Sequence, residues 1–340
     1  MTDYGITNLR QLLLNRESAV GTPGASWFMW RGLGQLDDQR AKVYPDEHIG
    51  IFSGTDRLYF PQLRGELPMP SHAATFEQIG HILDAGIVRA APFVDGSGGS
   101  GIIRTWPMPL TAADTVDEDD LQTYHAQAGN NVAVEVAGGM FVKSFTLSGA
   151  QNEAVMLSAV WETQEVADDP GGFAEAAIPT VEEILFNLGR IYIDDEDGDY
   201  GDTQVEGVWI NVTLNVETGW KALFTGDGSL EYSAKKQRPP EIMLNVTMEM
   251  TAEAIAAERT LARTGVPRLI RLDFTGSELE VYEEYTNKTL IIDLAGKWDK
   301  FDPMGEDDGD DIITGAFRCR YNAASASFFQ MLLVNEVAIL

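Results

Sequence analysis

Two parts of the chain follow the same order of sequence patterns. Each part has a short helical pattern, then a strand pattern, then an apolar run that ends in Ala-Gly. These patterns lie at residues 76–85, 102–106 and 134–138 in the first half, and at residues 253–263, 269–274 and 292–296 in the second. Self-similarity of this kind is typical of a structural unit used twice. The sequence therefore predicts a duplicated β unit, whose third pattern lies in residues 131–161 and again in residues 289–321.

Most of the periodicity along the chain is that of strands. Apolar and polar residues alternate, with many β-branched side chains, in residues 205–216, 228–234 and 242–250. A further strand is predicted around residues 59–63, and Pro68 and Pro70 interrupt it. Helical periodicity is confined to residues 74–85 and 252–263. Two helices among many strands predict a mainly β, α+β fold.

Glycine and proline indicate where the strands and the two halves are separated. Gly138-Gly139 and residues 225–228 are predicted turns. The best candidate boundary is residues 167–180, where prolines and glycines interrupt any regular pattern. We therefore expect two domains, residues 1–170 and residues 171–340.

The charge of the chain is strongly negative. The 340 residues include 24 Lys and Arg against 53 Asp and Glu, a net charge of −29. Such a surface repels phosphate backbones and anionic lipids, so sequence-specific nucleic-acid binding and peripheral membrane binding are not expected. The single cysteine, Cys319, lies in a predicted strand and is expected to be a buried thiol. The apolar run at residues 12–14 is too short for a signal peptide or a membrane span, which predicts synthesis in a reducing cytoplasm.

No motif in the chain predicts a reaction or a cofactor. Residues 95–101 contain G-x-G-x-x-G, but a strand pattern follows where a dinucleotide site needs a helix, so a mobile loop is predicted. The alternating aspartates at 195, 197 and 199 suggest calcium ligands, but an EF-hand register leaves two ligand positions without suitable side chains. This leaves only a weak cation site as a hypothesis. We predict no catalytic, cofactor-binding or metal-binding residues, and no enzymatic activity.

Acidic and aromatic residues are expected to serve structure. Two acidic runs, residues 194–202 and 306–311, fall between strands and are predicted to be solvated loops, and a third lies at residues 114–120. The histidines are scattered, which argues against a transition-metal site. Core packing and subunit contacts account for the seven tryptophans better than a sugar-binding face does.

The N-terminal half resembles a known family. Residues 17–25, Glu-Ser-Ala-Val-Gly-Thr-Pro-Gly-Ala, are similar to the E-x-x-x-G-T-P-x-x start of tail tube (major tail) proteins of bacteriophages with long, non-contractile tails. The similarity continues in residues 45–51, in the helix at 74–85 before a glycine, and in residues 149–162. It covers most of the first half as a pattern and the second half more loosely.

The resemblance implies a structural virion protein. Its fold would be two tail-tube-type β-sandwich or half-barrel domains, each with a flanking short helix, assembling into a ring with a continuous inner β-barrel. Stacked rings would form the hollow tail tube. The duplication favours trimeric rings with pseudo-sixfold symmetry, with hexamers as the alternative. Implied partners are copies of the chain, the tape measure, terminator and distal tail proteins, and DNA that passes through the lumen during genome ejection.

Two further expectations follow from charge and from the N-terminus. An acidic lumen would keep DNA moving, so many acidic residues are expected to line it. Residues 1–25 are expected to form an arm that docks on a neighbouring copy.

Two other functions remain open at this stage. The chain could be another β-sandwich virion component, such as a decoration or adhesion protein. Less favoured is a soluble acidic hydrolase, which would need a pocket of carboxylates with perturbed pKa values.

Overall fold

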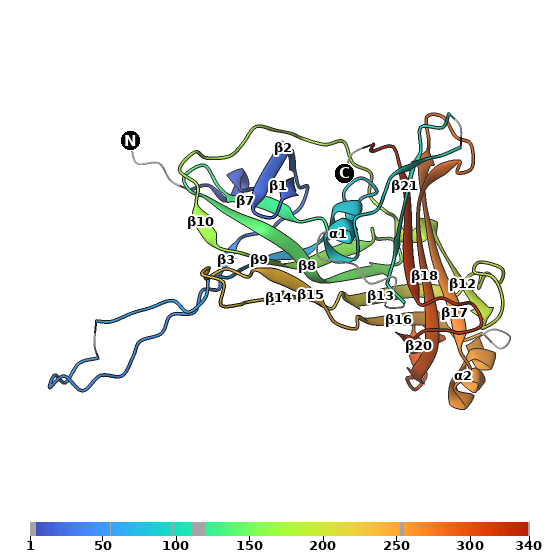
Figure 1. Cartoon of the computed structure of the whole chain (residues 1–340). Helices are drawn as coiled ribbons and strands as arrows, with labels where there is room; N and C mark the ends of the chain where they lie inside the picture. Colours follow the sequence, from blue (N-terminus) through green and yellow to red (C-terminus); the bar gives the residue numbers. More distant parts are fainter. Residues whose placement is uncertain (1–4, 55, 97, 111–119, 252–254, 339–340) are drawn as a thin grey trace.

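The computed structural model describes residues 5–54, 56–96, 98–110, 120–251 and 255–338, and it is mainly β (Figure 1). The elements of the first half are η1 (Thr7–Leu9), β1 (Gln11–Ala19), β2 (Thr22–Met29), β3 (Asp37–Asp38), β4 (Gly65–Ala73), α1 (Ile79–Gly86), β5 (Phe93–Val94), β6 (Ile102–Pro107), β7 (Tyr124–Gly129), β8 (Val134–Ala150), β9 (Met156–Thr163) and β10 (Val166–Asp168).

The elements of the second half are β11 (Ala176–Ala177), η2 (Phe186–Leu188), β12 (Gly189–Asp195), β13 (Trp209–Glu217), β14 (Trp220–Leu223), β15 (Ala234–Gln237), β16 (Glu241–Glu249), α2 (Ile255–Thr264), β17 (Arg268–Glu278), β18 (Asn287–Phe301), β19 (Gly305–Asp307), β20 (Asp310–Cys319) and β21 (Phe329–Asn335). The predicted mainly β class is therefore confirmed.

A central antiparallel sheet runs through both halves. Its strands pair in the order β3, β4, β9, β8, β13, β16, β20 and β18. One face carries the alternating apolar side chains, such as Leu214, Leu244 and Phe317, and is buried in the core. Helix α1 lies on this side of the sheet, in the middle of the molecule (Figure 1). The other face is described below as the open face.

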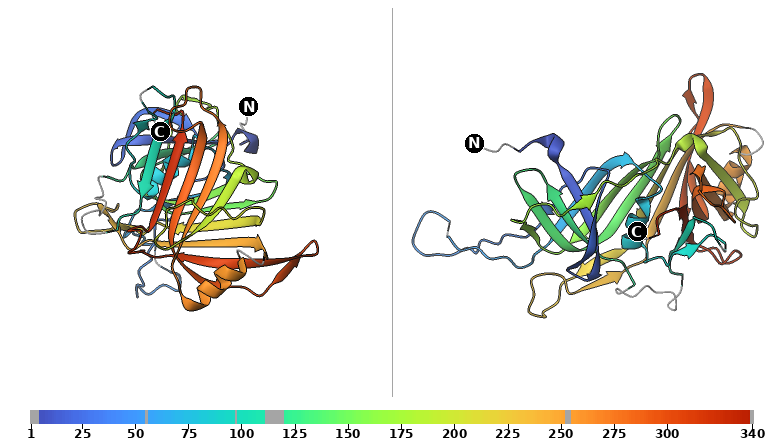
Figure 2. Two further views of the ribbon diagram at one scale, coloured as in Figure 1. Left: turned by 90° about the vertical axis from the view of Figure 1, so that its right-hand side faces the viewer. Right: turned by 90° about the horizontal axis from the view of Figure 1, so that it is seen from above.

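The long strands β8 and β18 each change partners along their length. The first part of β8 pairs with β7 and β10, and its second part pairs with β9 and β13. The first part of β18 pairs with β17 and β21, and its last residues pair with β20. Figure 2 shows the outer strands of the second half crossing the direction of the central strands. The molecule is therefore built around two bent strands.

Glycine permits the bend of β8. Gly138 and Gly139 lie inside the strand, so the turn predicted there is wrong. Gly139 has a φ of 63°, and its N–H donates to the buried carboxylate of Glu17 at 2.7 Å. Only glycine adopts such a φ without strain, so this backbone turns a corner between two sheets instead of ending a strand.

The two halves repeat one topology. The equivalent pairs are β1 and β12, β4 and β16, α1 and α2, β7 and β17, β8 and β18, β9 and β20, and β10 and β21. Both bent strands also have a register shift a few residues after the Ala-Gly run, between Val142 and Ser144 and between Trp298 and Lys300. The predicted duplication therefore holds as a topology, in which β1–β10 form a first unit and β12–β21 a second.

The strand equivalence proposed from sequence is wrong in one place. Strand β6, predicted as the partner of residues 269–274, pairs instead with β5 and with β21 of the second unit. The strand equivalent to β17 is β7, because both lie beside the first part of a bent strand. Strand β11 also pairs with β2 across the predicted boundary. The division at residue 170 stays a prediction.

Other expectations for single elements are wrong for identifiable reasons. Residues 228–233 form the loop of the β14–β15 hairpin, where Ser229 N–H donates to Asp227 instead of to a strand. Pro68 and Pro70 lie within β4 and do not interrupt it. Most of that strand has a neighbouring strand on one side only, so the missing proline N–H groups break no strand pairing. Residues 12–14 are buried in β1, which pairs with β7, so they do not belong to a docking arm.

Several predictions hold. Helix α1 ends at Gly86 as expected but begins at Ile79, five residues after the predicted start at 74. Helix α2 covers residues 255–264, and its predicted start at 252 lies outside the described residues. Cys319 is buried in β20 as a free thiol. Five of the seven tryptophans are at most 3% exposed, as core packing predicts. The acidic run at 114–120 lies outside the described residues except for Asp120.

Candidate functional site

The open face of the central sheet is a broad surface of short polar side chains. Its hydroxyl and amide groups come from Ser144, Thr146, Ser148, Ser158, Asn211, Thr213, Asn215, Asn245, Thr247 and Thr314. Neighbouring strands are linked across it, since Thr146 donates to Asn215 and Thr247 contacts Thr314, both at 2.9 Å. This face is neutral over most of its area.

Charged residues on this face gather at one end and are largely paired. Arg64 contacts Glu66 at 2.8 Å and Glu162 at 3.2 Å, and Lys143 contacts Glu66 at 3.1 Å. On the neighbouring strands, Arg318 contacts Glu241 at 2.6 Å. These ion pairs offset the negative charge of Glu66, Glu162 and Glu241 at that end of the open face.

The two units meet edge to edge in the central sheet. The second part of β8 pairs with β13 from Ser144 to Ala150, on the side opposite to β9. The equivalent side of β18 has no such partner in the part of the chain that the structure describes. Among the described residues, no strand pairs with Asp299 through Asp307 on the side away from β20. We call this segment, which includes β19, the open edge.

The opposite end of the sheet is also incompletely paired. In the described residues, β4 pairs with β3 only at Gly65 and Glu66 on the side away from β9. The chain before β3 runs beside β4, because Trp30 contacts His72 with ring centroids 5.4 Å apart. Between this segment and the sheet lies an apolar cavity of about 440 Å³, lined in part by Leu33, Met69 and Ala159. In the described residues, the central sheet thus has two incomplete edges.

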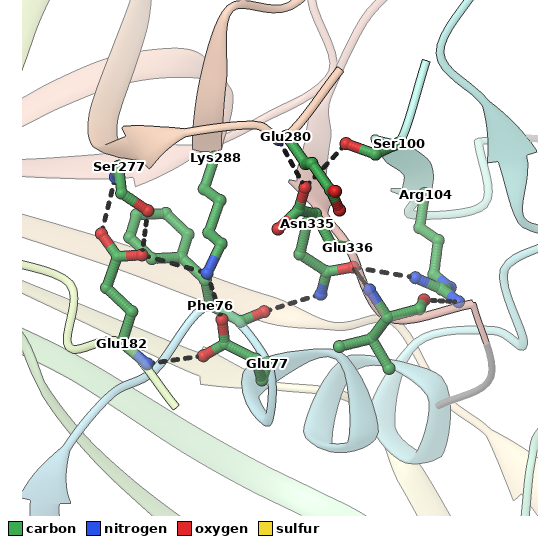
Figure 3. Close-up of polar contacts among 11 residues, drawn as sticks. Phe76, Glu77, Ser100, Arg104, Glu182, Ser277, Glu280, Lys288, Asn335 and Glu336 are labelled. Carbon is green, nitrogen blue, oxygen red and sulfur yellow. Dashed lines mark hydrogen bonds and ion pairs between the residues drawn. The ribbon is translucent and has the colours of Figure 1, made fainter. Parts of the chain in front are cut away.

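A polar network fixes the angle between the two units (Figure 3). Lys288 at the start of β18 contacts Glu77 at 2.7 Å and Glu182 at 3.0 Å. Glu182 lies in the segment between the units, and it accepts hydrogen bonds from Ser277, including one from its N–H at 2.6 Å. Glu77 in turn accepts a hydrogen bond from the Glu182 N–H at 2.7 Å. We call this set the inter-unit network.

A second group in Figure 3 connects β6 to the end of β21. Arg104 donates to the carbonyl of Val337 at 2.7 Å and to Asn335 at 3.3 Å. Asn335 is fully buried and donates to the carbonyl of Phe76 at 2.8 Å. Glu336 accepts from Ser100 at 2.6 Å. Together with the network around Lys288, these contacts join the two units.

The network perturbs the ionisation of its members. Burial would raise the pKa of Glu182, but hydrogen bonds from Ser277 and Lys288 outweigh it and lower that pKa. Burial would likewise lower the pKa of Lys288, but hydrogen bonds to Glu77 and Glu182 raise it. Both groups are therefore held in their charged forms across the neutral pH range.

A buried group of titratable residues lies in the first unit. Burial is the main factor that lowers the pKa of His81 to about 3, and the ring stacks on Phe28 at 4.0 Å. Asp84 is fully buried; it contacts Arg16 at 3.1 Å and accepts from Trp106 at 2.8 Å. His81 and Asp84 are themselves buried, and these partners all belong to the first unit, which fits a structural role better than acid–base catalysis.

The two remaining sequence motifs are also structural in the described residues. The carboxylate of Asp95, at the start of the glycine-rich segment, accepts hydrogen bonds from the N–H groups of Glu283 and Glu284. Strand β6 follows this loop, so no helix N-terminus is present for a phosphate. In the run 194–202, Asp194 is buried and accepts from Gly201 and Thr203, so it is not a solvated loop residue as predicted.

No cluster of three or more His, Cys, Asp or Glu residues suited to a metal ion is found in the described part of the chain. No helix within the described ranges is long and apolar enough to cross a bilayer. One sequence signal for the open face was missed: Ser, Thr and Asn alternate with apolar residues in β8, β13 and β16.

Comparison of the chain with models of known protein families and with characterised proteins finds no match.

Proposed function

We propose that the protein is a structural subunit that polymerises as stacked rings into a hollow tube, the tail tube of a bacteriophage. The observation that carries this proposal is the pair of non-equivalent edges. The first unit is joined to the second through β8 and β13, whereas the equivalent edge on β18 is open. An open edge is a liability for a monomer, and a second copy can satisfy it.

The contact that joins the units also suggests how copies join. A strand edge that pairs with the opposite edge of the next copy is a heterologous contact, and such contacts close into rings when the rotation between copies permits. Each chain supplies two equivalent units. Three chains would therefore give a ring of six units, the trimer with pseudo-sixfold symmetry.

The direction in which the central sheet would curve follows from which of its two faces is covered. Helix α1 and the outer strands pack on the core face of the central sheet. If the sheet closes into a barrel, that bulky side has to lie outside, and the open face lines the channel. The wall would then carry hydroxyls and amides, so the expectation that many acidic residues line the lumen does not fit this face.

A neutral wall is still suited to conducting DNA. Binding of a duplex depends mainly on cations that neutralise its phosphates. The open face has few unpaired cations along β8, β13 and β16, so it offers no row of phosphate contacts. DNA would pass without sequence-specific binding. The tape measure, terminator and distal tail proteins are the other partners that this role requires.

Electron microscopy of the concentrated protein tests this function. We expect rings or tubes, with a ring mass equal to a multiple of three chains. The variant Phe301→Pro removes a backbone N–H from the open edge; because the neighbouring Asp302 N–H donates to β20, that of Phe301 faces away from it. Phe301→Pro should stay dispersed, and Phe301→Leu should assemble. A dispersed wild-type protein at every concentration, or glycan binding or hydrolysis by that monomer, would favour the other functions considered above.

A further inference from the structure

The hairpin formed by β14 and β15 is basic, although the chain as a whole is acidic. Residues 218–240 contain Lys221, Lys235, Lys236 and Arg238 against two acidic residues, so this segment is positive in a chain of net charge −29. A local charge opposite to that of the molecule attracts partners that the rest of the surface repels. The hairpin is therefore a place where an anion can approach this protein.

Two lysines of the hairpin lie directly opposite each other. Lys221 of β14 pairs with Lys236 of β15 in the backbone register, and both side chains are exposed. Among the described residues, no carboxylate forms an ion pair with either of them. Like charges that face each other across two strands destabilise a hairpin. An anion that contacts both ammonium groups would relieve this repulsion.

The other face of the hairpin is packed against the body of the molecule. Trp220 of β14 and Tyr232 are buried against Phe141 of β8, and the Tyr232 hydroxyl donates to the carbonyl of Gly139. Successive side chains of a strand point to opposite sides, so Trp220 points inward and Lys221 points outward. The packing thus holds the lysine pair on the exposed face of the hairpin.

The hairpin lies on the open-face side of the central sheet. Phe141 and Glu162 are opposite each other across β8 and β9 and share a face, and Glu162 belongs to the charged end of the open face. Burial raises the pKa of Glu162, and Lys221 is one of three cations that oppose this rise. Figure 1 shows the hairpin beside β8 and β9 on the side away from α1. The lysine pair is therefore on the side of the sheet that would line the channel.

We infer that Lys221 and Lys236 form a contact for the phosphate backbone of DNA at one end of the channel wall. This inference rests on the proposed function, because it names the place where passing DNA touches the subunit. Lysine is a compact charge, and phosphate contacts carry no base-sequence information. Two ammonium groups per chain give a local contact instead of a continuous row, so the duplex can still move past them. The pair faces the channel and not the open edge, which favours DNA over an acidic segment of another copy.

The salt dependence of DNA binding by the dispersed full-length chain tests this contact. Fluorescence anisotropy measures the affinity for a short DNA duplex of mixed sequence at several low salt concentrations. Lys221→Gln combined with Lys236→Gln should weaken binding roughly tenfold and reduce the slope of log affinity against log salt by about 2, because two phosphate contacts are lost.

A matched double variant controls for net charge. Lys42→Gln combined with Arg263→Gln changes two exposed cations outside the hairpin, so it alters the net charge equally and should keep the wild-type slope. Absence of DNA binding by the wild-type chain, or equal slopes for the two double variants, would overturn the inference.

A lysine footprint locates the contact and separates it from the proposed function. Acetylation by an amine-reactive reagent, followed by mass spectrometry of peptides, should be roughly threefold slower at Lys221 and Lys236 with the duplex bound, and unchanged at Lys42. Protection of the pair on assembly without DNA would show that another copy occupies it, and would overturn the inference. Protection by DNA in a chain that never forms rings would contradict the proposed function and support the lysine contact. Ring formation by a chain whose dispersed form shows no protection by DNA would overturn the contact alone.

Discussion

At the scale of single residues, buried polar groups determine how the fold responds to pH. His81 is neutral in the folded protein with a pKa of about 3, whereas an unfolded histidine titrates near 6.5. Between these values the unfolded state binds the extra proton. The contribution of His81 to stability is therefore complete above the unfolded pKa and falls as the pH decreases.

This difference predicts a measurable slope. From pH 6 to pH 4, His81 should lower the free energy of unfolding by up to about 1.4 kcal/mol per pH unit. His81→Gln should remove that part of the slope, and His48→Gln, which changes an exposed histidine, should keep it. Denaturant unfolding at several pH values measures the difference; equal slopes for the wild type and His81→Gln would contradict the burial argument.

The ion pairs between the units give a second prediction at this scale. Lys288→Met leaves Glu77 and Glu182 close together without their cation, and it should destabilise the protein by about 1–3 kcal/mol. Lys300→Met removes an exposed pair with Asp302 and should change stability by less than about 0.5 kcal/mol. Urea unfolding measures both values. Similar values for the two variants would show that the inter-unit network does not hold the units.

The same network should weaken at both extremes of pH. The lowered pKa of Glu182 gives stability that is present above its unfolded value and is lost as the pH falls through the folded value. The raised pKa of Lys288 gives stability that is present below its unfolded value and is lost as the pH rises through the folded value. In Lys288→Met the loss at high pH should disappear, which melting temperatures across the alkaline range would show.

At the scale of elements, the bend in β8 depends on one residue. An added Cβ at Gly139 would lie 2.7 Å from the Tyr232 hydroxyl and 2.8 Å from the Gln164 side chain, at a φ of 63°. Gly139→Ala should therefore destabilise by about 2–4 kcal/mol. Gly207→Ala has a similar φ of 69° but open space around it, so it should cost only about 1 kcal/mol. Equal losses would show that only the backbone angle matters.

Local patterns predict some elements and not others. Alternation in residues 242–250 fixes β16, since one face of that strand is buried and the other is open. Gly138-Gly139 has the local pattern of a turn, and only the pairing of β8 with four other strands makes it a bend. Pro68 and Pro70 are tolerated inside β4 because most of that strand has a neighbouring strand on one side only. No local sequence pattern specifies this.

At the scale of the whole molecule, the sequence predicts the duplication but not the candidate site. The repeated Ala-Gly runs lie in equivalent bent strands, β8 and β18, as their order suggests. The open edge exists because, among the described residues, no strand lies beside Asp299 to Asp307 on the side away from β20. The inter-unit network joins residues that are far apart in the sequence, such as Glu77 and Lys288. Both depend on long-range contacts, so neither is visible as a motif.

The two incomplete sheet edges are the central claim, and amide hydrogen exchange tests it most directly. Exchange should be compared between dispersed and assembled protein, peptide by peptide. We predict that residues 299–307 and 30–38 gain protection on assembly, while the β8–β13 joint is protected in both states. Assembly without added protection in those two segments, or a protein that never assembles, would contradict the account.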